Sequence, residues 1–192
     1  MYRRYELLKD IAPVLDGSAL VVCNIGFPSQ ELYEINDTPN NFYMLGSMGL
    51  SSSIGLGVSL HTPKTVVAID GDGSVLMNLG TLSTIGNYAP TNYILLIVDN
   101  GAYGSTGDQP THTSGKTDLA AMSRAAGVES VYTVHEAETI GQLQACIEQC
   151  EQGEGPHVIV AKVDPGSPKL TPIPLSPGVI RDRFREVVQS TD

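Results

Sequence analysis

The chain has 192 residues, a hydrophobic content of 41% and a formal net charge of −10 at pH 7. This length is enough for one domain with a sizeable core. The acidic charge, with no basic tail or arm, argues against nucleic acid and anionic membranes as partners and favours a soluble protein.

The N-terminal segment predicts a helix over residues 2–15. Its apolar side chains, among them Leu8 and Ile11, recur at helical spacing. Pro13 lies near the end of this segment and would shorten the helix. The segment lacks the apolar core of a secretory signal, and no run in the chain reaches the roughly 18 apolar residues of a membrane span.

The rest of the chain alternates apolar runs with segments of helical spacing. The segment over residues 48–60 is rich in Gly and Ser, which cost helix propensity, so we expect close packing against a neighbouring backbone there. The predicted strands cover residues 19–23, 41–45, 65–69, 92–98, 129–134 and 157–163. The predicted helices cover residues 2–15, 30–36, 48–60, 76–87, 118–126, 136–152 and 178–189.

This alternation predicts a doubly wound α/β fold, with a mostly parallel sheet of about six strands and helices on both faces. We see no internal repeat and no domain boundary, so residues 1–192 are expected to form one domain. A long Gly-, Thr- and Ser-rich loop covers residues 99–116, and such loops are usually functional or mobile. A Pro-rich connector and the terminal helix occupy residues 164–192.

The cysteines indicate the compartment. There are three, Cys23, Cys146 and Cys150, and an odd number without C-x-x-C spacing is typical of reduced thiols in the cytoplasm. Cys146 and Cys150 stand one helical turn apart and would share a face. Buried apolar roles are favoured for this pair over a metal site.

Two polar motifs follow apolar runs that predict neighbouring strands. Gly71-Asp72-Gly73-Ser74 follows the first run, and Asn100 follows the second. If both strands are parallel, Asp72 and Asn100 lie at the carboxyl edge of one sheet, where open α/β sheets bind ligands. A carboxylate, an amide oxygen and nearby backbone carbonyls suit magnesium, which usually completes its shell with phosphate oxygens and water. The pair predicts a magnesium–diphosphate site.

A lone Gly-Asp-Gly is most often a surface turn. Here, however, the order of strand, motif, helix, strand and Asn, with the spacing from Ser74 to Asn100, resembles the thiamine diphosphate enzymes. In that family these residues hold the magnesium of the cofactor. The resemblance implies that Asp72, Asn100 and the backbone carbonyl of Ala102 bind magnesium. It also assigns three further residues of these motifs to cofactor binding: Gly71, Gly73 and Tyr103.

Gly46-Ser47-Met48-Gly49 opens the predicted small-residue helix. In the thiamine diphosphate enzymes a large apolar residue at this position holds the two cofactor rings in a bent conformation. The resemblance implies that Met48 is this wedge, that Gly46 offers its carbonyl to the aminopyrimidine, and that Ser47 belongs to the cofactor site. Without the other motifs, a core methionine at a helix start would be the preferred interpretation.

A second contact to the diphosphate is predicted after the first strand. Gly26 and Ser29 precede a predicted helix, and helix N-termini bind phosphate through free N–H groups. Ser74, at the start of the helix after the Gly-Asp-Gly motif, is a similar donor. Strand–turn–helix starts are common, so an ordinary helix start is the alternative.

The sequence of the long loop indicates which thiamine diphosphate enzymes the chain resembles most. Residues 101–113, with residues 77–85, 28–34 and 42–49, resemble sulfopyruvate and phosphonopyruvate decarboxylases, and the likeness covers most of residues 20–165. It is greatest for the form with separate α and β subunits. The resemblance implies decarboxylation of 3-sulfopyruvate to sulfoacetaldehyde and CO₂ in coenzyme M biosynthesis, with thiamine diphosphate and Mg²⁺ as cofactors.

Part of the expected active site is missing. In this family a glutamate on a separate pyrimidine-binding domain activates the cofactor, and this chain has no room for that domain. Glu31 and Glu34 are predicted to be surface residues. The resemblance therefore implies an α subunit that supplies the glutamate and most contacts to the anionic 2-oxo acid substrate. Without it, the chain could form a homodimer through the same surface.

Few basic side chains near the predicted site could bind an anionic substrate. His112 and Lys116 of the long loop are the candidates in sequence, because an anionic substrate is recognised by cationic side chains. His112 is assigned a catalytic role in binding substrate or moving protons. A solvated loop histidine is an equally good interpretation.

Other functions stay open. A subunit acting on phosphonopyruvate or another 2-oxo acid would carry the same motifs. The β subunits of 2-oxoacid:ferredoxin oxidoreductases share the Gly-Asp-Gly site but usually carry cysteines for an iron–sulfur cluster, and that spacing is missing here. A non-catalytic cofactor-binding module is a further alternative, although intact Asp72, Asn100 and Met48 argue against a decayed site.

Overall fold

The computed structural model describes residues 2–17 and 19–190. The described strands of the main sheet are Leu20–Cys23 (β1), Asn41–Tyr43 (β2), Val66–Gly71 (β3), Tyr93–Asp99 (β4), Ser130–His135 (β7) and His157–Lys162 (β8). The described helices are Arg4–Leu15 (α1), Phe27–Ile35 (α2), Ser51–Ser59 (α3), Asp72–Met77 (α4), Gly80–Tyr88 (α5), Leu119–Ala125 (α6), Glu138–Glu151 (α7) and Pro177–Gln189 (α8).

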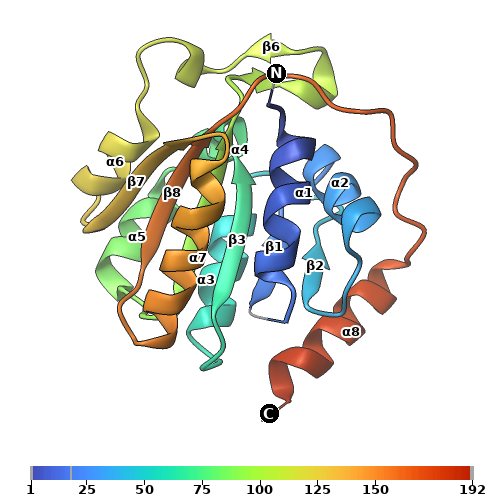
Figure 1. Cartoon of the computed structure of the whole chain (residues 1–192), viewed down its shortest axis with the longest axis vertical. Helices are drawn as coiled ribbons and strands as arrows, with labels where there is room; N and C mark the ends of the chain where they lie inside the picture. The colour runs from blue at the N-terminus through green and yellow to red at the C-terminus, as the bar shows by residue number, and fades with distance from the viewer. Residues whose placement is uncertain (1, 18, 191–192) are drawn as a thin grey trace.

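The main sheet has six strands in the order β2-β1-β3-β4-β8-β7, and every neighbouring pair is parallel. Helices cover both faces (Figure 1). Because both faces are covered, the central strands are mostly apolar, and β4 is buried along its whole length, up to and including its last residue, Asp99. The predicted doubly wound α/β fold is confirmed.

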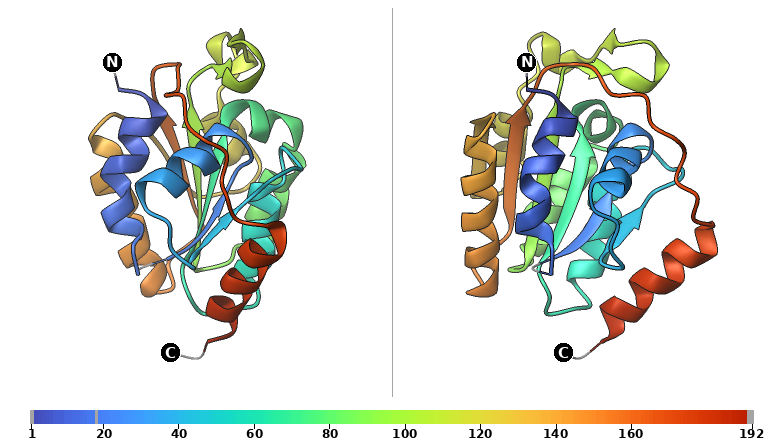
Figure 2. Two further views of the ribbon diagram at one scale, coloured as in Figure 1. Left: turned by 90° about the vertical axis from the view of Figure 1, so that its right-hand side faces the viewer. Right: turned by 45° about the vertical axis from the view of Figure 1, so that its right-hand side comes forward.

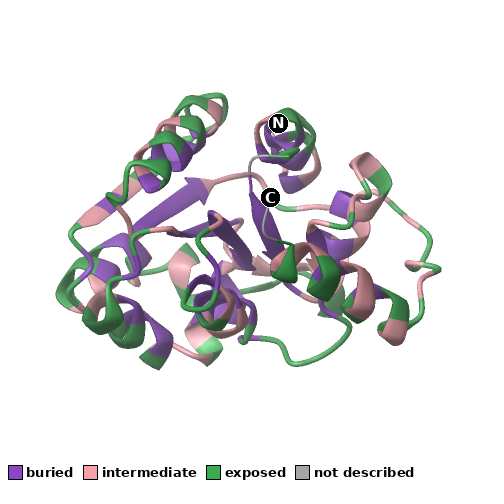
Figure 3. Ribbon diagram, turned by 90° about the horizontal axis from the view of Figure 1, so that it is seen from below, coloured by how far each residue is buried: buried purple, intermediate pink, exposed green. Residues whose placement is uncertain are grey.

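The core has two halves because successive strand residues point to opposite faces. Val67 and Ile69 of β3 pack under α1, α2 and α7. Val66 and Ala68 pack under α3, α5 and α6. Figure 3 shows buried residues concentrated in the sheet and on the parts of the helices that face it.

The small residues of α3 allow a close approach to the sheet at one position. A Cβ at Gly55 would lie 2.9 Å from the Cβ of Ala68 and 3.2 Å from the ring of Tyr93. The expected close packing is therefore confirmed at Gly55, although its nearest neighbours are side chains rather than backbone. Gly57 has no atom within 4 Å of such a position, so packing does not explain it.

Several predicted helix boundaries are wrong. Pro13 lies inside α1, which continues to Leu15 because the N–H of Asp16 bonds to the carbonyl of Ala12 and closes the last turn. The helix predicted over residues 76–87 is two helices, α4 and α5, separated at Asn78. The Asn78 amide donates to the carbonyl of Gly49 at 2.9 Å, which ties this break to the segment before α3.

The predicted long loop carries its own structure at the carboxyl edge of the sheet (Figure 1). It holds a hairpin of Ala102–Tyr103 (β5) and Gln109–Pro110 (β6) and the short 3₁₀ turns Gly104–Thr106 and His112–Ser114.

The Pro-rich connector leaves β8, passes the start of α1 and descends to α8 at the other end of the molecule (Figure 2). There Phe184 of α8 packs against Phe42 of β2, with ring centroids 5.4 Å apart. Arg183 pairs with Asp37 through both carboxylate oxygens, at 2.5 and 3.0 Å. The terminal helix therefore covers the side of the edge strand β2.

The predictions that the cysteines are reduced thiols and that Cys146 and Cys150 are buried are confirmed. All three are free and buried, and burial raises the pKa of the Cys23 and Cys150 thiols to about 12. In the described part of the chain, no helix is both long and apolar enough to cross a membrane.

His157 makes the stability of the fold sensitive to acid. It is buried at the start of β8, and neither ring nitrogen has a hydrogen-bond partner among the described residues. Burial lowers the pKa of His157, and the nearby Glu154 opposes this. The unfolded chain therefore takes up a proton at about pH 6.5, where the folded chain resists it. Stability is full above this pH and falls as the pH drops below it.

We expect a His157→Phe variant to lose this part of the pH dependence. The free energy of unfolding, measured by urea denaturation at several pH values between 7.5 and 5.5, should fall more steeply with acid in the parent chain than in the variant. The other three histidines, His61, His112 and His135, are exposed, so His157 is the one buried histidine among the described residues. Parallel pH profiles for the two proteins would contradict the prediction.

Candidate functional site

A crevice opens where the chain reverses direction across the sheet. After β1, α2 leads to one face, whereas after β3, α4 and α5 lead to the other. Such a topological switch point is where open α/β sheets bind ligands. A cavity of about 240 Å³ lies here. Its lining includes Asn24, Gly26, Met48, Gly71, Asp72, Gly73, Ser74, Asn100, Ala102 and Tyr103.

The register of the sheet brings the two predicted metal-binding motifs together. Gly71 at the end of β3 pairs with Val98 of β4, so Asp72 and Asn100 leave the sheet at nearly the same level. Asn100 is held in its loop because its Oδ1 accepts the N–H of Ala102 at 3.1 Å. Asp72, Asn100 and Ala102 all line the same cavity.

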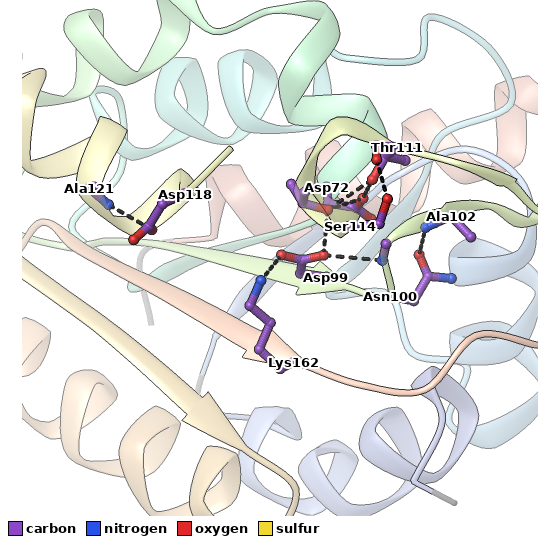
Figure 4. A network of polar contacts seen from close by, with 11 residues as sticks. Asp72, Asp99, Asn100, Ala102, Thr111, Ser114, Asp118, Ala121 and Lys162 are labelled. Atoms are coloured by element: carbon purple, nitrogen blue, oxygen red, sulfur yellow. Dashed lines mark hydrogen bonds and ion pairs between the residues drawn. The ribbon is translucent and has the colours of Figure 1, made fainter. Parts of the chain in front are cut away.

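Asp72 is the centre of a buried polar network (Figure 4). Its Oδ2 accepts hydrogen bonds from the hydroxyl of Thr111 and, at 2.9 Å, from that of Thr113. The Thr113 hydroxyl is also 2.8 Å from Oδ1 of Asp99. Lys162 donates to the other oxygen of Asp99. The long loop is thereby fastened to the ends of β3, β4 and β8.

The electrostatics of this network suit a cation. Burial raises the pKa of the Asp72 carboxyl; the Thr111 hydroxyl lowers it, and the negative charge of Asp99 raises it further. Lys162 pairs with Asp99 and, among the described residues, no ion pair joins a basic group to Asp72. A carboxylate, an amide oxygen and a backbone carbonyl around this cavity form the oxygen donor set that magnesium prefers. The described residues contain no alternative cluster of three or more His, Cys, Asp or Glu suited to a metal.

Two glycines and a serine shape the wall of the cavity. Gly26 caps the start of α2 with φ of 86°, a conformation that favours glycine. A Cβ on Gly73 would lie 2.3 Å from Cε1 of Tyr103, so the ring rests directly on this glycine. Ser74 joins two neighbouring segments, because its hydroxyl donates to Oδ1 of Asn24 at 3.2 Å and accepts the Gly49 N–H at 2.8 Å.

Met48 lines the cavity and is also 38% exposed. Three other large apolar side chains of the same region are exposed, Leu45, Leu50 and Met77, at 51%, 41% and 62%. Gly49 links this segment to α4, since a Cβ there would lie 3.3 Å from the Cβ of Met77. We call Leu45, Met48, Leu50 and Met77 the apolar rim.

Four predicted site residues are not among those that line the cavity: Ser29, Gly46, Ser47 and His112. The Ser29 hydroxyl donates to the carbonyls of Cys23 and Asn24, at 3.1 and 2.7 Å, at the end of β1. Ser29 also does not cap α2, which already begins at Phe27. Gly46, Ser47 and His112 are exposed.

The structure also brings residues to the site that sequence reasoning missed. Thr111 and Thr113 lay inside the loop motif, but nothing in their local pattern indicated that they contact Asp72. Arg4 of α1 lines the cavity, and its side chain forms a buried ion pair with Glu31 of α2. The expectation that Glu31 is a surface residue is therefore wrong; Glu34 is exposed as expected.

The chain is similar to several known proteins. Residues 24–161 match the family described as thiamine pyrophosphate enzyme, C-terminal TPP binding domain. The chain is 48% identical to the sulfopyruvate decarboxylase β subunit of Methanococcus maripaludis, over 97% of both chains. It is 44% identical to that of Methanocaldococcus jannaschii, again over 97% of both chains.

Two further comparisons involve longer proteins. The phosphonopyruvate decarboxylase of Streptomyces viridochromogenes is 41% identical over 96% of this chain and 46% of its own length. Among solved structures, the thiamine diphosphate-dependent 4-hydroxybenzoylformate decarboxylase of Rhodococcus jostii aligns with a TM-score of 0.66 and 17% identity, over 84% of this chain and 32% of that chain. At this identity the likeness concerns the fold alone.

Proposed function

Because the chain belongs to the thiamine pyrophosphate enzymes, and within them to the sulfopyruvate decarboxylase β subunits, we propose that it binds thiamine diphosphate through Mg²⁺ and forms half of a decarboxylase active site. The observation that carries the proposal is the cavity at the switch point, which is lined by Asn100, Ala102 and a buried Asp72 that has no cationic partner among the described residues. The substrate proposed is 3-sulfopyruvate, converted to sulfoacetaldehyde and CO₂.

Each lining residue has a proposed role. Asp72, Asn100 and the Ala102 carbonyl bind magnesium, which in turn holds the diphosphate. The first turns of α2 and α4, at Gly26 and Ser74, offer N–H groups to phosphate oxygens. Met48 supports the bent shape of the cofactor. The bound cofactor supplies a thiazolium ring that stabilises the carbanion formed as CO₂ leaves.

The missing acid supports a partner subunit. Among the described residues that line the cavity, Asp72 is the single carboxylate and no glutamate is present. Glu31 is engaged by Arg4. We therefore propose that an α subunit supplies the glutamate that activates the cofactor and the main contacts to the substrate anion. The apolar rim beside the cavity is a suitable surface for this subunit, because exposed apolar side chains gain from burial.

Two further parts of the proposal depend on the likeness to relatives. The sulfoacetaldehyde product would enter coenzyme M biosynthesis, in the cytoplasm. Phosphonopyruvate is the second candidate substrate, because the phosphonopyruvate decarboxylase described above is 41% identical over nearly this whole chain. Sulfonate and phosphonate groups are similar anions, so the two substrates need a direct comparison.

The proposed function is tested by purifying the chain in complex with its α subunit and measuring CO₂ release with thiamine diphosphate and Mg²⁺. We expect kcat/KM for 3-sulfopyruvate to exceed that for phosphonopyruvate by about tenfold or more, the discrimination that one altered polar contact provides. The reverse preference would assign phosphonopyruvate as the substrate. Loss of turnover after Mg²⁺ is removed with EDTA, and its return on adding Mg²⁺, is the matched control.

A further inference from the structure

We propose that Arg4 binds the terminal phosphate of the cofactor, so that α1 supplies a diphosphate-binding residue. This inference rests on the proposed function for the identity of the ligand. Arg4 is the first residue of α1 and lines the cavity, although it lies far in sequence from the other site residues. Its side chain is only 9% exposed.

The guanidinium group of Arg4 is held in one orientation by its neighbours. Nε donates to Oε2 of Glu31 at 2.7 Å, and Nη2 donates to Oε1 of Glu31 at 3.0 Å and to the Ser167 hydroxyl at 2.5 Å. Nη1 makes no hydrogen bond to any described residue. Nη1 is also not one of the buried side-chain atoms that lack a partner, so it is accessible and is the edge available to a ligand in the cavity.

The position of Arg4 corresponds to the phosphate end of the cavity. It lies beside α2, whose first turn has no side-chain cap, and the Ser105 and Thr106 side of the hairpin loop lines the same cavity. Met48 instead precedes α3, on the opposite face of the sheet. If the cofactor rings lie at Met48 and magnesium at Asp72, the outer phosphate extends toward Arg4. Guanidinium groups suit this role because their planar N–H pairs match phosphate oxygens.

This role also explains the course of the Pro-rich connector. The connector passes the N-terminus of α1 before it descends to α8 (Figures 1 and 2). The backbone N–H of Tyr2 bonds to the Asp164 carboxylate at 2.9 Å, and Ser167 contacts Arg4 directly. The connector therefore adds a second contact to the same Nη2 group that Glu31 binds, which lowers the entropy that the side chain would lose on binding phosphate.

The test compares thiamine diphosphate with thiamine monophosphate, which lacks the terminal phosphate. Affinities are measured by isothermal titration calorimetry with Mg²⁺ on the chain in complex with its α subunit. We expect Arg4→Ala to weaken thiamine diphosphate binding by about tenfold or more, as for loss of a charge-assisted hydrogen bond. The affinity for thiamine monophosphate should change by less than about threefold.

Arg183→Ala is the matched control, because Arg183 also forms a two-point ion pair, with Asp37, but does not line the cavity. We expect it to leave both affinities unchanged. Equal losses for the two ligands in Arg4→Ala, or no loss, would assign Arg4 a purely structural role and overturn the inference.

If Arg4→Ala does not fold, Arg4→Gln serves the same test. It removes the positive charge but keeps an amide that can donate to Glu31, and a loss confined to thiamine diphosphate supports the inference, whereas equal losses or none overturn it. Failure of the parent complex to bind thiamine diphosphate at all would overturn the proposed function as well. The two failures are therefore distinguishable.

Discussion

An Asp72→Asn variant is expected to lose magnesium-dependent binding of thiamine diphosphate. Asp72 is the only charged group among the three proposed metal ligands, and it is 1% exposed. Breaking a buried charge pair costs about 3–5 kcal/mol, which corresponds to a loss of affinity of about 100-fold or more. The measurement is calorimetric titration of cofactor into the α/β complex, with Mg²⁺ and with EDTA.

The variant should lose its ligand without losing its fold. Burial raises the pKa of the Asp72 carboxyl, so the metal-free protein bears a cost for this charge, and the neutral amide removes that cost. We therefore expect the free energy of unfolding in EDTA to stay equal or to rise. Asp118→Asn is the matched control, since Asp118 is an exposed cap of α6, apart from the network around Asp72 (Figure 4).

Undiminished cofactor binding by Asp72→Asn would contradict the metal assignment. A fall in stability in EDTA would instead show that the carboxylate is mainly a fastening point for Thr111 and Thr113. The two measurements together separate the role of Asp72 as a ligand from its role in holding the long loop.

The central part of the fold and site could be predicted because its information is local. Each of β3 and β4 is a continuous apolar run, which is typical of a strand covered on both faces, and each run ends in a polar motif. Once the strands are parallel neighbours, Asp72 and Asn100 must lie at one edge. Gly26 was predicted from the pattern in the same way, because it stands between a strand and a helix start, whereas Met48 was assigned through the resemblance to the thiamine diphosphate enzymes.

The other features of the site could not be predicted because they depend on contacts between segments that are distant in sequence. Arg4, Glu31 and Ser167 belong to α1, α2 and the connector, and no spacing within any one of them indicates that they meet. Glu31 looked like a surface residue because an unpaired glutamate is almost never buried, whereas its arginine partner makes burial possible. Ser29 illustrates the opposite case, since a serine at a predicted helix start is usually a cap, yet its hydroxyl bonds to the end of β1.

The isolated chain is expected to be catalytically inactive. We expect the isolated chain to show no turnover of 3-sulfopyruvate with thiamine diphosphate and Mg²⁺, and full turnover once the α subunit is added in equal amount. The described residues around the cavity supply a metal site and a wall at Met48, but no glutamate to activate the cofactor. The isolated chain should also bind the cofactor more weakly, because the side of the cavity at the apolar rim faces water.

The apolar rim provides the decisive comparison. Met77 is 62% exposed and does not line the cavity, so Met77→Lys should leave the isolated chain folded while reducing both complex formation and restored turnover. Val179 of α8 is 46% exposed on another part of the molecule, and Val179→Lys should reduce neither. Light scattering measures assembly, including any homodimer of the isolated chain that the α subunit displaces. Turnover by the isolated chain would refute the half-site proposal, because the activating acid would then have to come from this chain or from its second copy.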